Sequence, residues 1–474
     1  MGGGGWKRLH PLSPIFHLFG LIKALVITAL LVYFAASGDK QELFLGVALV
    51  VAAVVHLYRH FVMRYRITDD DLVIRRGLVF KSERHIPIGT INNVDIVQNI
   101  AARWLKVAEA RIQTASGGEA EAALKVLSLD DVQLIRDRLA GGVTTSDSTE
   151  STEQSAPLVR LSTPDLVRLG LINNRGLVVV AFGMGIAQQI GVFDRLPDLE
   201  VLFKQASALA APLSIAVTVA AVIAFLLLFS VLISINRFSG FELRRVGDDF
   251  RLRCGLFTQR SATIPRRRVQ LVSIRSTPLH RLNKRVGVRV ETAGGTQDKV
   301  TVFGRLWFAP LVRTDEGDRV VGELGFPVPG SIDWQPLAPG AFRRKLKKTL
   351  IVYVPVAALI AVLAWPWGVL VGPSLVVLAV VHTRADIRRT QWSAADGLIA
   401  FRSGVIFRKT TIARPNASQV VTVTESPFDR RRSMARLSVD TAGAGPAGHT
   451  IRIPYLARRT ADDSARRLAG AAAG

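Results

Sequence analysis

Six long apolar runs divide this chain into three similar sections. They occupy residues 18–36, 43–58, 177–193, 211–235, 350–365 and 368–382. Each run is close to the roughly 17 to 25 residues that a helix needs to cross a bilayer, and the runs occur in pairs. We therefore predict six transmembrane helices arranged as three hairpins.

Each pair of apolar runs is followed by short stretches in which apolar and polar residues alternate between turns. This pattern is typical of small antiparallel sheets. In each of these β-units a glycine is followed 37 positions later by a threonine. The pairs are Gly77 and Thr114, Gly255 and Thr292, and Gly404 and Thr441. Three equal spacings indicate a threefold internal repeat.

The repeat predicts seven segments. They are a first hairpin at 1–62, a first β-unit at 63–140, a linker at 141–157, a second hairpin at 158–236, a second β-unit at 237–325, a third hairpin at 326–390 and a third β-unit at 391–474. The linker is rich in Gly, Ser, Thr, Glu and Gln without apolar periodicity, which predicts a flexible segment.

Local signals mark several helix starts. Pro14, Pro164 and Pro339 precede the three hairpins, and proline is tolerated in the first turn of a helix. Thr460 and Asp463 have the spacing of a capping box, which predicts the start of a helix that closes the third β-unit.

The charge of the chain is strongly positive. It has 61 Lys and Arg against 37 Asp and Glu, a net charge of +24, which favours an anionic membrane surface, an acidic protein or a nucleic acid as partner. Basic residues crowd the ends of the apolar runs that adjoin the β-units, whereas the opposite loops carry only Lys40, Arg195 and Lys204. This asymmetry predicts that the β-units and both termini are cytoplasmic.

The second β-unit carries the clearest copy of the repeat. It reads Gly255-Leu256-Phe257, then Ile264-Pro265-Arg266-Arg267-Arg268-Val269-Gln270, then Val290-Glu291-Thr292-Ala293-Gly294-Gly295. The apolar frame of residues 264–270 predicts a strand. The first copy keeps Ile86-Pro87 and Thr114-Ala115-Ser116-Gly117, and the third keeps Thr441-Ala442-Gly443.

These motifs, together with the hairpin before each unit, resemble the bacterial pleckstrin-homology-like (PH-like) domains of YdbT-like membrane proteins. The resemblance covers essentially the whole chain. It implies an α+β membrane protein in which each hairpin is followed by a cytoplasmic, partly open β-barrel of about seven strands with a C-terminal helix. It brings no catalytic residues, and it suggests a smaller YdbS-like membrane protein as a partner.

Basic clusters are the candidate site. Arg266, Arg267 and Arg268 form a block that the other two copies lack, and a second group consists of Arg281, Lys284 and Arg285. Each cation near an anionic membrane contributes about 1 kcal/mol of attraction, so these residues are candidates for contact with lipid headgroups or an acidic partner. The alternative is that they are solvated residues of strands and turns.

Other chemistry finds little support. A search for a P-loop, a nucleophile elbow and the zinc-protease and kinase motifs finds none, so we expect no enzyme activity, catalytic residues or cofactor. His56 and His60 have a chelating spacing without a third ligand, so we expect no metal. A single cysteine, Cys254, excludes an internal disulfide framework. Aromatic residues are not interleaved with the basic ones, which argues against nucleic acid.

Two functions remain. The first is a non-enzymatic platform whose PH-like units contact anionic inner-leaflet lipid, a YdbS-like partner or other copies of the chain. The alternative is a component of a transport, export or stress-resistance system in which the six helices form a path that the PH-like units regulate. That alternative depends on polar residues within the spans, chiefly Gln188 and Gln189.

Overall fold

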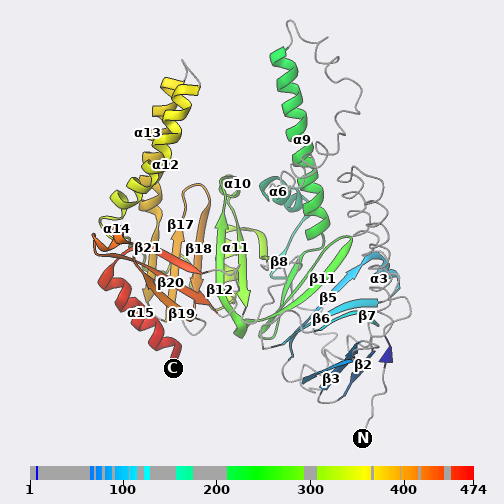
Figure 1. Cartoon of the computed structure of the whole chain (residues 1–474). Helices are drawn as coiled ribbons and strands as arrows, with labels where there is room; N and C mark the ends of the chain where they lie inside the picture. The colour runs from blue at the N-terminus through cyan, green and yellow to red at the C-terminus, as the bar shows by residue number, and fades with distance from the viewer. Residues whose placement is uncertain are drawn as a thin grey trace, which may run out of the picture. The chain divides into compact units, whose positions relative to one another are not determined.

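The computed structural model divides into two compact units, each of which is described by itself (Figure 1). The described residues are 7–8, 64–68, 71–76, 81–87, 91–105, 107–114, 122–128, 156–173, 211–292, 307–363, 368–395, 397–414, 418–441 and 450–473. The predicted spans at 18–36, 43–58 and 177–193, nearly all of the predicted linker, His56 and His60 lie outside them. The first unit holds most residues up to Thr263, and the second holds residues 247–250 and Ile264 onward. The boundary between the units therefore falls inside the second β-unit.

The first unit contains two antiparallel sheets. A four-stranded sheet has the order β1-β2-β3-β4, and a seven-stranded sheet has the order β7-β6-β5-β11-β10-β9-β8. The strands are β1 (Lys7–Arg8), β2 (Arg64–Ile67), β3 (Asp71–Arg76), β4 (Ser82–Pro87), β5 (Ile91–Asn99), β6 (Val107–Thr114), β7 (Ala122–Ser128), β8 (Val159–Arg160), β9 (Glu242–Val246), β10 (Asp249–Cys254) and β11 (Thr258–Pro265). Its helices are α3 (Ile100–Trp104), α6 (Thr163–Asn173) and α9 (Ala211–Phe238).

The second unit repeats this plan. A seven-stranded sheet has the order β14-β13-β12-β18-β17-β16-β15, and a three-stranded sheet has the order β19-β20-β21. The strands are β12 (Val269–Ser276), β13 (Arg285–Thr292), β14 (Trp307–Arg313), β15 (Gln335–Pro336), β16 (Gln391–Ala395), β17 (Leu398–Ser403), β18 (Arg408–Ala413), β19 (Ser418–Thr424), β20 (Met434–Thr441) and β21 (Ile451–Ala457). The helices are the 3-10 turn η3 (Arg266–Arg268), α10 (Pro278–Leu282), α11 (Thr314–Glu323), α12 (Ala341–Leu363), α13 (Gly368–Arg389), α14 (Pro427–Arg430) and α15 (Arg458–Ala473).

Both seven-stranded sheets combine strands from two consecutive copies of the repeat. We call β4, β11 and β18 the third strands of the copies, and β5, β12 and β19 the fourth strands. The fourth strand of the first copy, β5, pairs antiparallel with the third strand of the second copy, β11. In the same way β12 of the second copy pairs with β18 of the third. The described strands form open sheets and no closed barrel, and the two halves of a copy belong to different sheets.

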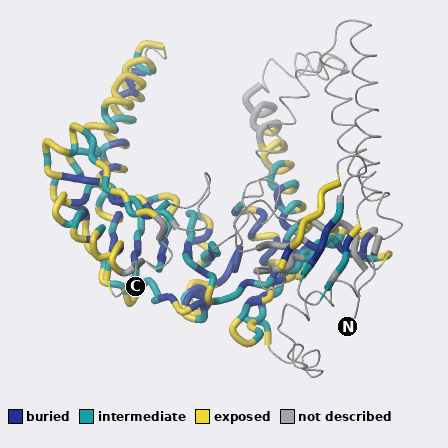
Figure 2. Tube along the Cα trace, turned by 60° about the horizontal axis from the view of Figure 1, so that its bottom comes forward, coloured by how far each residue is buried: buried dark blue, intermediate teal, exposed yellow. Residues whose placement is uncertain are grey.

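The core of the third copy shows how the layers are held together. Trp392 and Ile399 of the seven-stranded sheet share one buried cluster with Leu437 of β20 and Leu468 of α15. Leu271, which belongs to β12 of the second copy, is fully buried in the same cluster. Complete burial of a leucine contributes about 1.5 to 3 kcal/mol, so a neighbouring copy helps to stabilise this core. Figure 2 shows the buried positions along these strands.

Three helices in the described part of the chain are long and apolar enough to cross a membrane. They are 220–238 within α9, α12 and α13. Helices α12 and α13 pack against each other, and Gly372 allows close approach because a Cβ there would lie 2.7 Å from the carbonyl oxygen of Ala357. Their outer surfaces expose large apolar side chains, including Ile351 at 74% and Leu363 at 76%, as expected of lipid-facing helices (Figure 2).

Two helix starts agree with the sequence and two local predictions are wrong. Helix α6 carries Pro164 in its first turn, and α12 begins just after Pro339. The stretch 264–270 is not one strand, because η3 separates the end of β11 from the start of β12. Helix α15 begins at Arg458, so Thr460 lies inside it rather than at a capping position. The ion pair of Arg458 with Asp462, at 2.8 Å, stabilises the first turn instead.

Candidate functional site

The six basic residues singled out from the sequence do not form one site. Arg266, Arg267 and Arg268 form η3, which leads into β12, whereas Arg281, Lys284 and Arg285 follow the end of β12 in and after α10. Strand β12 has eight residues, so the two groups are separated by about 26 Å along the sheet at roughly 3.3 Å per residue. Each group therefore has its own surroundings.

The first group lies beside another arginine, Arg414, and a carboxylate, Asp248. Arg266 forms an ion pair with Asp248 at 3.6 Å. Arg414 donates hydrogen bonds to the carbonyl oxygens of Leu324 and Gly325, both at 3.2 Å. Burial, followed by the nearby charge of Arg266, lowers the pKa of Arg414 from its ordinary value. Arg267 is exposed. The first group thus combines an exposed cation with guanidinium groups already engaged by this unit.

The second group surrounds the short helix α10. Arg281 donates hydrogen bonds to the carbonyl oxygens of Val405 and Ile406, at 3.2 and 2.9 Å, in the loop before β18. Lys284 is exposed and adopts a positive φ of 51°. Arg285, the first residue of β13, is half-buried. Burial, then the charges of Arg389 and Arg281, lowers the pKa of Arg408. Three guanidinium groups therefore lie within electrostatic reach of one another.

The second group lies at the end of the sheet where the long helices leave it. Helix α13 ends at Arg389, and β16 begins at Gln391. Because Gln391 pairs with Arg402, the loop between β17 and β18 returns to this same end. Ser276, at the end of β12, pairs with Arg408 beside that loop. In Figure 1 α10, α14 and the turn between β17 and β18 lie toward α12 and α13.

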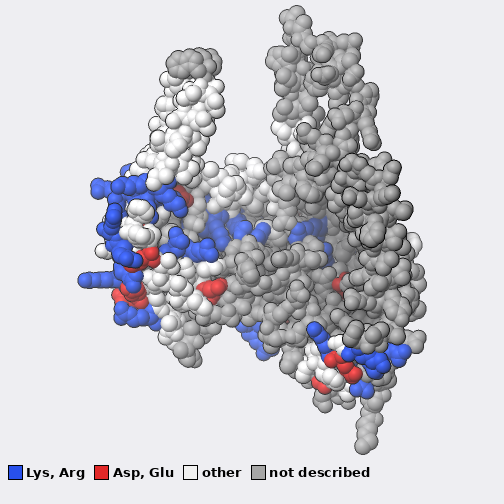
Figure 3. Space-filling model, viewed as in Figure 1, with Lys and Arg blue, Asp and Glu red and all other residues white. Residues whose placement is uncertain are grey.

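Large apolar side chains project between the cations at this end. We call this surface of the second unit the rim. It consists of Leu279 (44% exposed), Leu282 (80%), Ile406 (47%), Phe407 (71%) and Phe428 (62%), together with Arg281, Lys284, Arg389, Arg408 and Arg430. Exposed apolar groups among Lys and Arg suit the boundary between headgroups and acyl chains. Figure 3 shows Lys and Arg gathered where α12 and α13 meet the sheets.

The rim contains apolar residues that the charge pattern alone does not reveal. The signal was present in the repeat, since Val405 and Ile406 follow Gly404 as Leu256 and Phe257 follow Gly255. Phe257 is likewise exposed, at 55%. The apolar residue two positions after the repeated glycine is therefore at the surface in both copies and not part of a core strand.

Each copy builds its short helix with the same cap, and we call α3, α10 and α14 the capped helices. The backbone amide of the residue three positions on donates to Asn99 Oδ1 at 2.7 Å, to Thr277 Oγ1 at 3.3 Å and to Ser426 Oγ at 3.2 Å. Satisfying an orphan amide in this way fixes where the helix starts. The capped helix of the first copy also exposes apolar residues, with Ile100 at 42% and Trp104 at 88%.

An ion pair connects the capped helix of the third copy to a long helix. Arg344 in the first turn of α12 donates to Asp429 at 2.7 Å, and both side chains are largely buried. Burial opposes ionisation of Asp429, but hydrogen bonds from Ser426 and Arg344 outweigh it and lower the pKa of this carboxyl. Lys345 pairs with Asp386 of α13 one residue further on. The first pair thus fixes α14 to the base of α12, and the second fixes α12 to α13.

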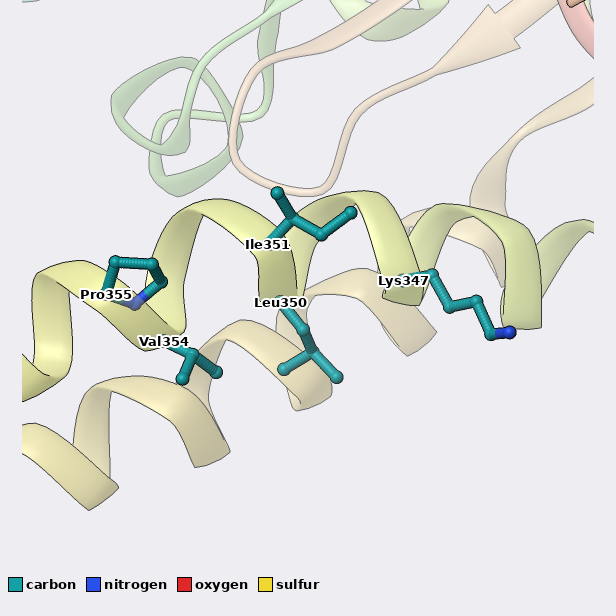
Figure 4. A pocket seen from close by; sticks show the side chains of 5 residues that line it. All are labelled: Lys347, Leu350, Ile351, Val354 and Pro355. Carbon is teal, nitrogen blue, oxygen red and sulfur yellow. The ribbon is translucent and has the colours of Figure 1, made fainter. Parts of the chain in front are cut away.

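The long helix α12 also carries an open recess. It is lined by Lys347, Leu350, Ile351, Val354 and Pro355 (Figure 4). Apart from Lys347 the lining is apolar, and it lies on a helix of spanning length. Such a surface suits an acyl chain better than a polar substrate.

Comparison with known proteins agrees with this architecture. The family model described as Bacterial PH domain matches three times, at residues 17–143, 198–314 and 343–472. The chain belongs to the bacterial PH domain family. It is also similar to the UPF0699 transmembrane protein YdbT of Bacillus subtilis (strain 168), with 22% identity over 458 residues that cover 91% of this chain and 92% of the relative. No solved structure matches it.

The matches confirm the resemblance to YdbT-like proteins and the threefold repeat of bacterial PH domains. Each match also reaches into the apolar segment before its strands, so apolar segments and strands recur together along the sequence. The protein is a membrane protein with three bacterial PH domain copies.

Proposed function

We propose that this protein is a non-enzymatic membrane platform on which the rim contacts the headgroups of anionic inner-leaflet lipids. Six spans arranged as three hairpins hold the three bacterial PH domains at the cytoplasmic face, with both termini in the cytoplasm. A YdbS-like membrane protein or further copies of this chain are the expected protein partners.

The main support for the lipid contact is the composition and place of the rim. Exposed Leu282 and Phe407 lie among Arg281, Arg389 and Arg408 at the end of the sheet from which the long helices leave. A surface of this kind gains from partial burial of apolar groups and from the attraction of about 1 kcal/mol per cation to anionic lipid. Anchored helices keep the rim near the bilayer, so weak contacts suffice.

The first basic group is a poorer candidate for lipid. Residues 266–268 lie at the other end of β12, about 26 Å from the rim by strand length. Arg267 is exposed at that end, away from a bilayer that contacts the rim. It therefore suits contact with an acidic protein surface better than contact with lipid. We therefore assign the lipid contact to Arg281 and Lys284, and leave Arg267 as a candidate contact for a partner.

The transport alternative has no feature of the described helices in its favour. Ser230, Ser374 and Thr383 of the long helices donate their hydroxyl groups to backbone carbonyls. Gln188 and Gln189, on which the alternative depended, lie outside the described residues. The alternative stays a prediction.

The platform is tested with the intact chain in lipid nanodiscs. Spin labels on Leu282→Cys and Phe407→Cys should collide with dissolved oxygen, which concentrates in the bilayer, more often than with an aqueous nickel complex. A label on Arg267→Cys should show the opposite preference and is the matched control. Replacing phosphatidylcholine with phosphatidylglycerol should deepen the first two labels, and salt should reverse the change.

Purely aqueous accessibility at both Leu282→Cys and Phe407→Cys would refute the lipid contact. A bilayer signal that ignores phosphatidylglycerol and salt would leave apolar insertion intact but exclude headgroup recognition by Arg281 and Lys284.

A further inference from the structure

One edge strand of the second unit has the same construction as two strands that are paired. Among the described strands, β19 pairs only with β20. Its equivalents β5 and β12 each pair on the other side with the third strand of the next copy, β11 and β18. Among the described strands, no third strand of another copy pairs with β19.

The equivalence of the fourth strands is exact in register. Each pairs with the following strand through the repeated threonine, as Ile91 with Thr114, Val269 with Thr292 and Ser418 with Thr441. In all three the register then shifts by one residue. This bulge aligns Val420 with Leu271 and Thr422 with Ser273. Leu271 and Ser273 are fully buried, whereas Val420 is 55% exposed and Thr422 is exposed.

We call the pairings of β5 with β11 and of β12 with β18 the joints between copies, and the two joints have the same register. Four residues after the repeated glycine, Gln259 pairs with Gln98 and Arg408 pairs with Ser276. Gln98 and Ser276 are themselves equivalent in the fourth strands. One register therefore joins the first copy to the second and the second to the third.

An arginine of the capped helix reinforces each joint. Arg103 of α3 donates to the carbonyl oxygen of Leu256 at 2.7 Å, and the equivalent Arg281 of α10 donates to that of Val405 at 3.2 Å. Leu256 and Val405 both follow the repeated glycine of the next copy. The equivalent residue of the third copy, Arg430, keeps a 75% exposed side chain and lies 3.9 Å from Glu425. Strand β19 and Arg430 thus repeat one side of such a joint, and no described residue of the chain forms the other side.

We propose that β19 and Arg430 receive the third strand of the first copy, β4, of a second molecule of this chain. Among the described strands, β4 pairs only with β3, and it is the third strand that joins no fourth strand. The register of the internal joints places Ser82 opposite Thr424 and Arg84 opposite Thr422.

The proposed contact is heterologous, because one molecule contributes β19 and the other contributes β4. Such contacts extend a chain of molecules unless rotation closes a ring. An open edge strand is also a place where proteins associate unless it is covered, which gives the pairing its driving force. This assembly does not rest on lipid contact at the rim.

Disulfide trapping in native membranes tests the assembly. Ser82→Cys and Thr424→Cys are placed in two differently tagged full-length chains that are co-expressed, so that a disulfide between the tags joins two molecules. Directly opposed antiparallel residues have Cα atoms about 4.5 to 5.5 Å apart, within the range of a disulfide. Glu83→Cys with Thr424→Cys is the matched control, because a shift of one residue turns the side chain to the opposite face.

The expected result is a disulfide-linked species carrying both tags for Ser82→Cys with Thr424→Cys, and little or none for the control. Arg430→Ala should reduce its yield, whereas Arg459→Ala should not, because Arg459 is an exposed residue of α15 away from β19's open edge. In a second experiment both cysteines are placed in the same chain. A disulfide within one molecule would overturn the proposal, because the chain's own β4 would then cover β19. Absence of the two-tag species in membranes, where both single variants are folded and present, would also overturn it. Recovery of the Thr424→Cys chain joined to a different bacterial PH domain protein instead would assign the edge to that partner and overturn the second-copy assignment.

Discussion

The ion pair of Arg344 with Asp429 should hold the third bacterial PH domain to the base of α12. The two groups are 2.7 Å apart, and their side chains are only 17% and 15% exposed. Replacing Arg344 with alanine leaves the carboxylate of Asp429 buried without its cationic partner. Loss of one partner of a fully buried pair costs about 3 to 5 kcal/mol, and partial exposure lowers the expected cost to about 2 to 3 kcal/mol.

For a unit of this size each kcal/mol shifts the melting temperature by roughly 2 to 4 °C, so Arg344→Ala should lower it by about 4 to 12 °C. Arg343, the preceding residue of the same helix, is exposed, and Arg343→Ala is the matched control with an expected effect within about 0.5 kcal/mol. Combining Arg344→Met with Asp429→Asn should cost less than the sum of the two single changes, because neither then leaves a buried charge alone.

The measurement is thermal unfolding of the full chain in nanodiscs, with hydrogen exchange of peptides from α14 and β20 to locate the loss. Exchange should rise first in α14 and should stay unchanged in α11. Equal small effects of Arg344→Ala and Arg343→Ala, or strict additivity with Asp429→Asn, would show that the pair does not couple the helix to the domain.

Three further predictions follow from buried or crowded groups. Burial lowers the pKa of His280 to about 4, so the stability that neutral His280 contributes is complete above pH 6.5 and is lost as the pH falls toward 4. The melting temperature should therefore drop between pH 6.5 and 4. His280→Gln should make this drop smaller. Burial raises the pKa of the Cys254 thiol to about 11, so a thiol reagent at pH 8 should react only after denaturation, and rapid reaction of the native protein would contradict this. Gly372→Leu should separate α13 from α12 and cost about 1 to 3 kcal/mol of stability. Gly322→Ala has nothing within 4 Å of the new Cβ, so it should stabilise α11 by about 0.5 to 1 kcal/mol. Equal melting temperatures for the two variants would rule out the close approach of α12 and α13 at Gly372.

The repeat was predictable because it rests on local backbone geometry. Gly255 and Gly404 have φ values of 112° and 92°, and a Cβ at either position would lie 2.0 Å from the carbonyl oxygen of the residue three positions on. Only glycine fits such a turn, so its spacing to the threonine survives while the rest of the copies diverge. The same constraint carried the family resemblance that the comparisons confirm.

The exchange of strands between copies was not predictable in this way. The alternation of Val272 and Ser273 along β12 gives the faces of a strand, but nothing in it says which strand lies at each edge. An edge is specified by backbone hydrogen bonds, which every residue except proline can make. The prediction of a barrel in each copy therefore stays unconfirmed, and the described strands lie in open, shared sheets.

The two basic groups show a similar limit. The sequence correctly places Arg266 and Arg281 in different segments, but it does not show that an eight-residue strand holds them apart. Nor does it reveal that Arg281 already donates to Val405 and Ile406. Such contacts depend on loops more than a hundred positions away, and local patterns carry no information about them.

The shared sheets mean that the unit of folding is displaced by half a repeat from the unit of duplication. If one complete copy is added to or removed from the chain, a third strand still pairs with a fourth strand at the new junction, with the same register and the same arginine. Copy number can therefore change without redesign of any joint. A chain cut at the borders of one repeat would instead separate β12 from β18 and lose the leucine that β12 contributes to the next core.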